Sequence, residues 1–240
     1  MADIGEIITK VIKLLGVELE INPHTIITTW VIILFILFFA LLIRRGLRKI
    51  PNRLQVFFEM VYNFFAQMCQ EALGPEGKKF IPLILTIFIF VLISNWSGVI
   101  PGQHGPTEDL NTCLGLGILV FVIAHFSAII KKGIKGYLGA YFKPFFFFLP
   151  INVIGEFGKV ISHSFRLFGN MFAGGIIFAL GAPVLFSTFE SLNLPIISAV
   201  PLAIIIYIIL QTFFGLFVGF VQALVFSLLA LTYIAVLRGD

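Results

Sequence analysis

Six polar or ionisable side chains recur at helical spacing in an apolar part of the chain between residues 150 and 182. They are Asn152, Glu156, Lys159, His163, Arg166 and Asn170. At 100° per residue, this spacing places all six within an arc of about 80° on one helix face. Neighbouring members can touch, which allows relays such as Glu156–Lys159 or Glu156–His163–Arg166. Such a face must line water or contact a polar partner, because lipid cannot satisfy it. The alternative is that these groups neutralise one another between packed helices.

Arg166 carries the strongest functional signal on this face, because residues 171–189 after it contain no charge. A guanidinium stays ionised at any working pH. Placing one near the centre of a bilayer costs about 2.5–3.5 kcal/mol on insertion scales. A membrane protein that keeps such a charge is expected to use it. The alternative is an arginine whose long side chain only reaches back to the membrane surface.

The composition indicates an integral membrane protein. Hydrophobic residues make up 59% of the chain and charged residues 12%, and the mean hydropathy is +1.07. A soluble domain carries about 25% charged residues. The net charge of +4 comes from basic residues beside apolar segments, which is typical of membrane topology and not of nucleic-acid binding. Cys69 and Cys113 lack metal-binding spacing, and no phosphate-binding loop motif is present. We therefore expect no metal, cofactor or ATP site.

Charge-free apolar stretches predict a single all-α membrane domain with three ordinary spans, at residues 25–43, 80–100 and 112–130. Apolar residues at helical spacing predict an amphipathic helix over residues 51–73, along the cytoplasmic surface. The same spacing over residues 1–20 predicts a short amphipathic helix lying on the membrane outside.

Two further helices, at residues 151–181 and 196–237, are too long for ordinary spans. The uninterrupted stretches that contain them would each extend about 50 Å at 1.5 Å per residue, whereas the hydrocarbon core is about 30 Å thick. We favour a hairpin of two long tilted helices; the alternative is that each stretch splits in two. One face of the second helix carries a set of small and polar residues, which are Gln211, Gly215, Gln222 and Tyr233.

Two basic clusters predict the orientation in the membrane. Residues 44–53 and 131–143 contain Lys and Arg but no acid, whereas the loop at 101–111 contains two acids and no Lys or Arg. Basic clusters mark the cytoplasmic side. The N-terminus is then expected outside and the C-terminus in the cytoplasm.

The arginine lies in a motif that resembles a known family. Residues 164–174 read SFRLFGNMFAG, which is similar to the signature of subunit a of F-type ATP synthases. Residues 88–102, ending SNWSGVIPG, resemble the second membrane span of that family, and residues 106–112 resemble its PTxDxNxT loop, shortened by one position. The resemblance covers nearly the whole chain, and its arginine motif is highly specific.

The resemblance implies a stator subunit that faces a rotating ring of c subunits. Its other expected partners are the b subunits of the peripheral stalk, the rest of the ATP synthase and the lipid of a bacterial inner membrane. Ions would pass through one half-channel to a ring carboxylate and leave through another, with Arg166 separating the two. The chain would hold no ATP site and would be no enzyme by itself. By matching position, Asn170 and Gln222 would flank Arg166, and Asn95 would lie near the inner half-channel.

The remaining ion path is less defined. We expect Glu156, His163 and Glu190 near the outer half-channel. The path is also expected to include Asn152, Lys159 and Gln211. Relatives carry an acid and a histidine at positions that are Gly175 and Gly215 here, and a proline where Val160 stands. These departures leave the choice between protons and Na⁺ open.

Two other functions remain as alternatives. A secondary transporter could use a buried arginine for an anionic substrate, but it predicts repeats and interrupted spans, which this sequence does not contain. A purely structural membrane subunit would not need six polar groups on one face.

Overall fold

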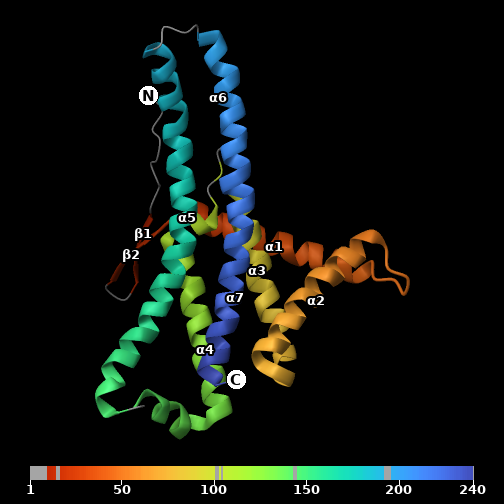
Figure 1. The fold of residues 1–240 in the computed structure, drawn as a ribbon, viewed down its shortest axis with the longest axis vertical. Helices are drawn as coiled ribbons and strands as arrows, with labels where there is room; N and C mark the ends of the chain where they lie inside the picture. Colours follow the sequence, from red (N-terminus) through yellow and green to blue (C-terminus); the bar gives the residue numbers. More distant parts are fainter. Residues whose placement is uncertain are drawn as a thin grey trace.

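Long helices make up most of the molecule and confirm the predicted all-α membrane fold (Figure 1). The computed structural model describes residues 10–14, 17–100, 103, 105–142, 145–191 and 196–239. Its α-helices are α1 (Pro23–Arg45), α2 (Arg53–Leu73), α3 (Ile81–Ser97), α4 (Leu110–Tyr141), α5 (Leu149–Ser191), α6 (Ile196–Leu210) and α7 (Gly219–Arg238). Its shorter helical elements are the 3-10 turns η1 (Gly74–Lys79), η2 (Pro106–Glu108) and η3 (Phe146–Phe148), and the π-helical segment η4 (Gln211–Val218).

Several of these helices fit a bilayer. Among the described residues, three stretches are long and apolar enough to cross a membrane, namely Pro23–Arg45, Leu110–Tyr141 and Val200–Arg238. A fourth is present if Arg53–Lys79 and Ile81–Ser97, which are bent by 111° at a short break, count as one broken span. The chain is therefore a multi-pass membrane protein.

Helix α1 begins and ends where its sequence requires. The Asn22 side chain accepts a hydrogen bond from the His24 N–H at 3.0 Å, and Pro23 occupies the first turn, where its missing N–H has no helical partner to lose. Arg44 and Arg45 lie in the last turn, where cations stabilise the helix dipole. Most large apolar side chains of α1 are exposed in this chain, which suits a helix surrounded by lipid.

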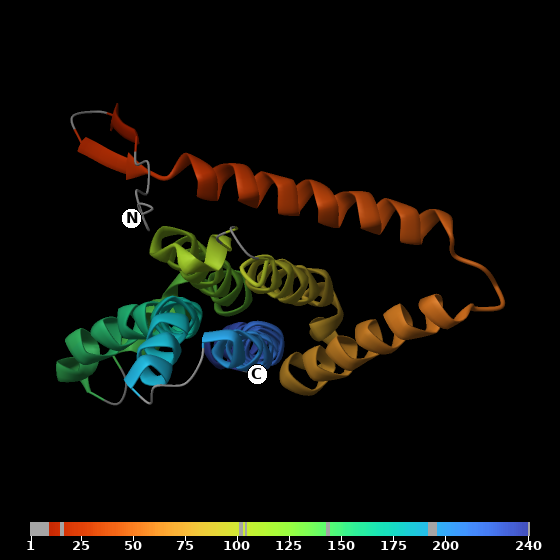
Figure 2. The same cartoon turned by 90° about the horizontal axis from the view of Figure 1, so that it is seen from above.

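Helix α2 is amphipathic and turns sharply into α3. Asn52 caps its start by accepting from the Gln55 N–H at 2.8 Å. Its apolar face packs into the core through Phe65, whose ring lies 4.8 Å from that of Phe88 on α3. Gly74 ends it with φ 61 and ψ −144, a conformation that side-chain-bearing residues rarely adopt. The bend keeps α2 beside the bundle (Figure 2).

The core forms where α3, α4, α5 and α7 pack together with the end of α2. Its buried members include Ile84 and Val91 of α3, Ala124 of α4, Leu167 of α5 and Phe226 of α7. Close packing of α4 on α5 depends on Gly117, because a Cβ there would collide with the Ser164 hydroxyl. Small residues allow membrane helices to approach in this way.

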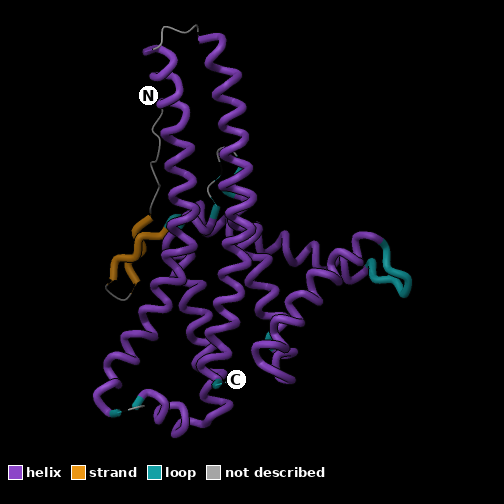
Figure 3. The backbone as a smooth tube through the Cα atoms, viewed as in Figure 1, coloured by secondary structure: helices purple, strands orange, loops and turns teal. Residues whose placement is uncertain are grey.

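The long hairpin is present, but its first helix exceeds the predicted 151–181. Helix α5 continues through Pro183 to Ser191. Proline removes one backbone donor, and membrane helices tolerate it inside the helix. The second arm covers the predicted 196–237, with α6, η4 and α7 following one another without a loop (Figure 3). The π-helical η4 widens this arm at Gln211–Val218.

The directions of α1 and of the bundle indicate how the long helices lie in a bilayer. Helix α1 runs across the bundle and not along it (Figures 1 and 2). With 23 residues, it is about 35 Å long, close to the hydrocarbon thickness of about 30 Å. Helix α5, with 43 residues, is about 65 Å long. If α1 crosses the membrane directly, the hairpin must be strongly tilted.

The N-terminal segment differs from the prediction. In place of a helix within residues 1–20, the described residues form strands β1 (Lys10–Leu14) and β2 (Val17–Ile21), which pair antiparallel with Lys13 opposite Glu18. The sequence VELEI alternates strictly between apolar and acidic residues, and strict alternation is the period of a strand. The isoleucines that precede this sequence recur at helical spacing, and this spacing led to the prediction of a helix. Residues 1–9 lie outside the described residues.

Candidate functional site

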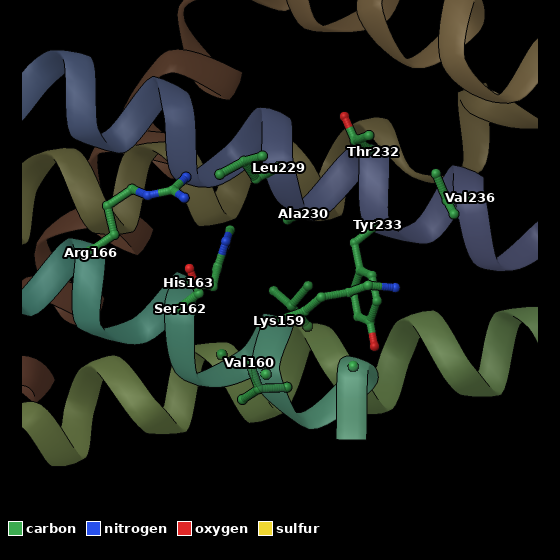
Figure 4. Close-up of a pocket in the computed structure, with 14 residues that line it drawn as sticks. Lys159, Val160, Ser162, His163, Arg166, Leu229, Ala230, Thr232, Tyr233 and Val236 are labelled. Atoms are coloured by element: carbon green, nitrogen blue, oxygen red, sulfur yellow. The ribbon is translucent and has the colours of Figure 1, made fainter. Parts of the chain in front are cut away.

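The polar face of α5 lies against α7, so it does not face lipid alone. In Figure 4, Arg166 and His163 project from α5 toward α7, and Lys159 lies beside Tyr233 of α7. The Lys159 ammonium is 5.1 Å from the centre of the Tyr233 ring. Because α5 and α7 run in opposite directions, each level of α5 faces a defined level of α7 (Figure 1).

Asn170 and Gln222 join the two arms at the middle of the site. The Asn170 Nδ2 donates to the Gln222 Oε1 at 2.5 Å, and Gln222 is only 5% exposed. The Gln222 Nε2 is buried and has no hydrogen-bond partner among the described residues. Arg166 lies one turn before Asn170 and is exposed, so its guanidinium is available to a partner outside this chain.

A first cavity opens on the side of Arg166 that leads to the C-terminus. It has a volume of about 450 Å³ and is lined by Gly117, Val120, Gly155, Gly158, Lys159, Val160, Ser162, His163, Arg166, Leu229, Ala230, Thr232, Tyr233 and Val236. The His163 ring packs on Phe226 with ring centres 3.9 Å apart. Its Nε2 is buried without a partner among the described residues. The predicted Glu156–His163–Arg166 relay is therefore not formed by direct hydrogen bonds.

Glu156 instead belongs to a network at the far end of this cavity. Its carboxylate accepts from the Lys159 ammonium and from the Tyr233 hydroxyl, each at 2.7 Å. The Tyr233 hydroxyl is also 3.4 Å from the His125 Nδ1, and the His125 Nε2 is 3.3 Å from the Tyr141 hydroxyl. The predicted Glu156–Lys159 pair is thus present. Helix α4 adds His125 and Tyr141 to this network. These two residues were not predicted, because they are far from Glu156 and Tyr233 in the sequence.

Asn152 lies at the start of α5, beyond this network. Its Nδ2 donates to the Tyr141 carbonyl oxygen at 2.8 Å. This hydrogen bond joins the start of α5 to the end of α4. Asn152 does not line the first cavity.

A second, smaller cavity lies on the other side of the Asn170–Gln222 pair. Its volume is about 40 Å³, and it is lined by Asn95, Gly98, Val99, Glu108, Asn170, Met171, Gly174, Gly175, Gln211, Phe214 and Gly215. A single water needs roughly 10–15 Å³ of such volume, so the cavity can hold water. The Asn95 Nδ2 donates to the Gly219 carbonyl at 2.9 Å, and the Gln211 Nε2 donates to the Val99 carbonyl at 2.5 Å.

The order of residues along both arms separates the two cavities. On α5, the first cavity involves residues 155–166 and the second residues 170–175. On the other arm, the first involves residues 229–236 and the second residues 211–215. Gln222 lies between these levels on its arm, and its partner Asn170, one turn after Arg166, is the first residue of α5 that lines the second cavity. Arg166 lines the first cavity, and the second cavity begins one helical turn away, at Asn170.

Two sequence-based assignments stay predictions whose sides depend on the orientation in the membrane. Asn95, expected near the inner half-channel, lines the second cavity together with Glu108 of the 101–111 loop. His163, expected near the outer half-channel, lines the first cavity, at whose far end Glu156 bonds to Tyr233 near the C-terminus. If the basic clusters are cytoplasmic, the two sides are exchanged, because α5 starts at the cytoplasmic end and its early residues remain there.

Glu190 is not brought to either cavity. It lies exposed near the end of α5, about 30 Å along the helix from Asn170 at 1.5 Å per residue. Its role in an ion path stays a prediction without geometric support.

The two glycines that depart from the family pattern have different surroundings. A Cβ on Gly215 would collide with the Val99 side chain, so the α3 end and η4 approach too closely for a histidine here. A Cβ on Gly175 would meet nothing within 4 Å. Val99 therefore occupies the space beside Gly215, whereas the space beside Gly175 is open.

The fold and site define a multi-pass membrane protein with an arginine at the edge of one cavity and a second cavity one helical turn away. A family model described as ATP synthase A chain matches residues 26–235. A protein named ATP synthase subunit a from Moorella thermoacetica is 36% identical over 211 residues, or 88% of each chain. One of the same name from Desulforamulus reducens is 34% identical over 219 residues, covering 90% of this chain and 80% of that one. The chain belongs to the ATP synthase subunit a family.

Proposed function

We propose that this chain is the ion-translocating stator subunit of a rotary ATP synthase, in which two half-channels lead to and from a c-ring carboxylate and Arg166 separates them. The observation that carries the proposal is the position of exposed Arg166 one turn before the Asn170–Gln222 bond, at the edge of the first cavity and one turn from the second. The ion is a proton or Na⁺.

Arg166 acts on the ring carboxylate by charge. A fixed cation within about 4–6 Å favours the ionised form of a carboxyl group. Each ring carboxylate therefore releases its ion as it reaches Arg166 and takes up another only after it has passed. The same cation repels ions that would move directly between the cavities. Each unit charge that crosses supplies about 2.3 kcal/mol per 100 mV of membrane potential, and this energy drives rotation.

The proposed orientation follows the positive-inside rule. The first cavity, near Tyr233 and the C-terminus, serves the cytoplasmic half-channel, and the second, near Glu108, serves the outer one. The N-terminus lies outside the bacterial inner membrane. The c-ring faces Arg166, the b subunits of the peripheral stalk hold the chain in place, and ATP forms on other subunits.

Dependence on the ring tests this function against the alternative of a secondary transporter. The chain is reconstituted into lipid vesicles alone and as part of the complete ATP synthase, and ATP-driven and passive ion fluxes are followed. We expect flux only from the complete complex. Substrate or ion transport by the isolated chain would instead identify a transporter that uses Arg166 for an anionic substrate.

The Asn170–Gln222 bond gives a testable coupling between the arms. We expect Gln222→Leu to lower ATP-driven pumping about tenfold, because Asn170 loses its acceptor and its position beside Arg166. Polar side chains in contact typically have interaction free energies of roughly 0.5–3 kcal/mol. A change of about 1.4 kcal/mol in activation free energy corresponds to a tenfold change in rate. Asn170→Leu should cause a similar loss, and the double variant should lose little more than either alone.

The matched control for this pair is Ser227→Ala. Ser227 is also buried on α7, but its hydroxyl bonds only within the helix, to the Ala223 carbonyl. Pumping by the control should stay near the wild-type rate. Fully additive losses in the Asn170 and Gln222 variants would show that the two side chains act independently.

A further inference from the structure

Asn95 and Gln211 both line the second cavity, and each leaves its amide oxygen unpaired among the described residues while its amide nitrogen is used in a hydrogen bond. The amide nitrogens of both residues donate to backbone carbonyls, of Gly219 and Val99. A carbonyl only accepts hydrogen bonds, so this pairing fixes which way each amide points. The Asn95 Oδ1 and the Gln211 Oε1 are left buried without a partner among the described residues. Asn95 is 1% exposed, so its free oxygen is a strong indication that a donor or cation belongs here.

A carboxylate lines the same cavity. Glu108 lies at the end of η2, and its Oε1 accepts from the Gly105 N–H at 3.0 Å. A Cβ on Gly98 would collide with that oxygen, so the glycine allows the carboxylate to lie directly against the end of α3. Glu108 and two residues with unpaired amide oxygens thus line one cavity of about 40 Å³. All three are ligands for a hard cation or acceptors for a protonated water.

We infer that Glu108 is the carboxylate that first binds the ion in the outer half-channel and passes it toward the Asn170–Gln222 pair. The inference rests on the proposed function. For a proton, hydronium gives its proton to the carboxylate and leaves as water; the carboxylic acid then gives the proton to a water in the cavity and becomes carboxylate again. For Na⁺, the carboxylate and the two amide oxygens replace part of its hydration shell, with no covalent change.

The test compares two neighbouring acids in the complete ATP synthase. Glu108→Gln keeps an oxygen that can accept from the Gly105 N–H but removes the charge. Asp109→Asn keeps the cap of α4, because asparagine can accept from the Asn111 N–H as Asp109 does, and Asp109 does not line the cavity. In vesicles, we expect ATP synthesis driven by an imposed ion gradient to fall about tenfold for Glu108→Gln and to stay unchanged for Asp109→Asn.

A second pair of variants separates loss of charge from damage to the fold. Gly175 lines the same cavity and has room for a side chain. Added to Glu108→Gln, Gly175→Glu should restore most of the lost rate, whereas Gly175→Gln, of nearly the same volume, should not. Equal recovery with either residue would overturn the role of the charge.

The outcomes separate this inference from the proposed function and also identify the ion. If Arg166→Ala abolishes synthesis while Glu108→Gln works at the wild-type rate, the inference is wrong and the proposed function stands. If Arg166→Ala also works normally, the proposed function itself fails. Gradients of protons alone and of Na⁺ at equal pH on both sides show which cation Glu108 serves, since the variant defect should appear only with that cation.

Discussion

Replacement of Arg166 by alanine is expected to lower ATP-driven pumping and ion-driven ATP synthesis at least a hundredfold. Without the guanidinium, nothing at the junction of the two cavities favours the ionised ring carboxylate. Truncating one partner of a close charge pair typically costs about 2–5 kcal/mol, and a hundredfold change corresponds to about 2.7 kcal/mol. Both activities are measured in vesicles that contain the complete ATP synthase, with an acidity-sensitive dye and with added or withheld Na⁺.

Arg48→Ala is the control for loss of a positive charge. Arg48 is an exposed arginine in the segment between α1 and α2, and it does not line either cavity. We expect the Arg48→Ala variant to retain full activity, because exposed charged side chains contribute little free energy to stability. Pumping by Arg166→Ala at the control rate would reduce the polar face of α5 to a packing feature.

The second large effect is expected from Glu156→Gln, at about a tenfold loss of pumping. The Glu156 carboxylate joins Lys159 to Tyr233 at the end of the first cavity, so its charge controls the path between Arg166 and the cytoplasm. Neutralisation leaves the Lys159 ammonium uncompensated in that path, where it repels cations. The rate of ATP-driven pumping measures the effect.

The loss should be one of transport and not of folding. The Lys159 side chain is 48% exposed and the Glu156 side chain 14%, so the pair is open to solvent on the lysine side. Glutamine in place of Glu156 keeps an oxygen that can accept from the Tyr233 hydroxyl. The thermal stability of the assembled membrane sector should therefore change little. Glu59→Gln, on the exposed side of α2, is the matched control. If the loss of pumping is matched by an equal loss of assembled ATP synthase, Glu156 has a structural role and not one in transport.

The sequence predicted those features that depend on local periodicity. Helical spacing placed Glu156 and Lys159 on one face, and the structure shows them in contact. Length and lack of charge predicted the long hairpin. The predicted end of the first long helix at residue 181 was wrong, because α5 continues through Pro183 to Ser191, and membrane helices tolerate an internal proline. The β1–β2 hairpin was missed because helical and strand periods overlap in a segment of β-branched residues.

Features that depend on distant contacts could not be predicted in this way. The second cavity joins Asn95, Glu108 and Gln211 from three elements, and no local pattern connects a loop acid to a helix about a hundred residues later. The Arg238 side chain is similar: it is 5% exposed, bonds to the Ser127 hydroxyl at 2.7 Å and pairs with Glu76. Ser127 and Glu76 lie more than a hundred residues from Arg238 in the sequence, so no local pattern indicates these contacts.

The most direct test of the central claim is passive ion flow through the membrane sector with its ring held still. The soluble head is removed, ring and stator are cross-linked so that rotation stops, and flux down an imposed ion gradient is compared for wild type and Arg166→Ala. If Arg166 separates two half-channels, the wild type will be tight, and the variant will leak, because the cavities then meet without a cation between them. A variant as tight as the wild type would contradict the account.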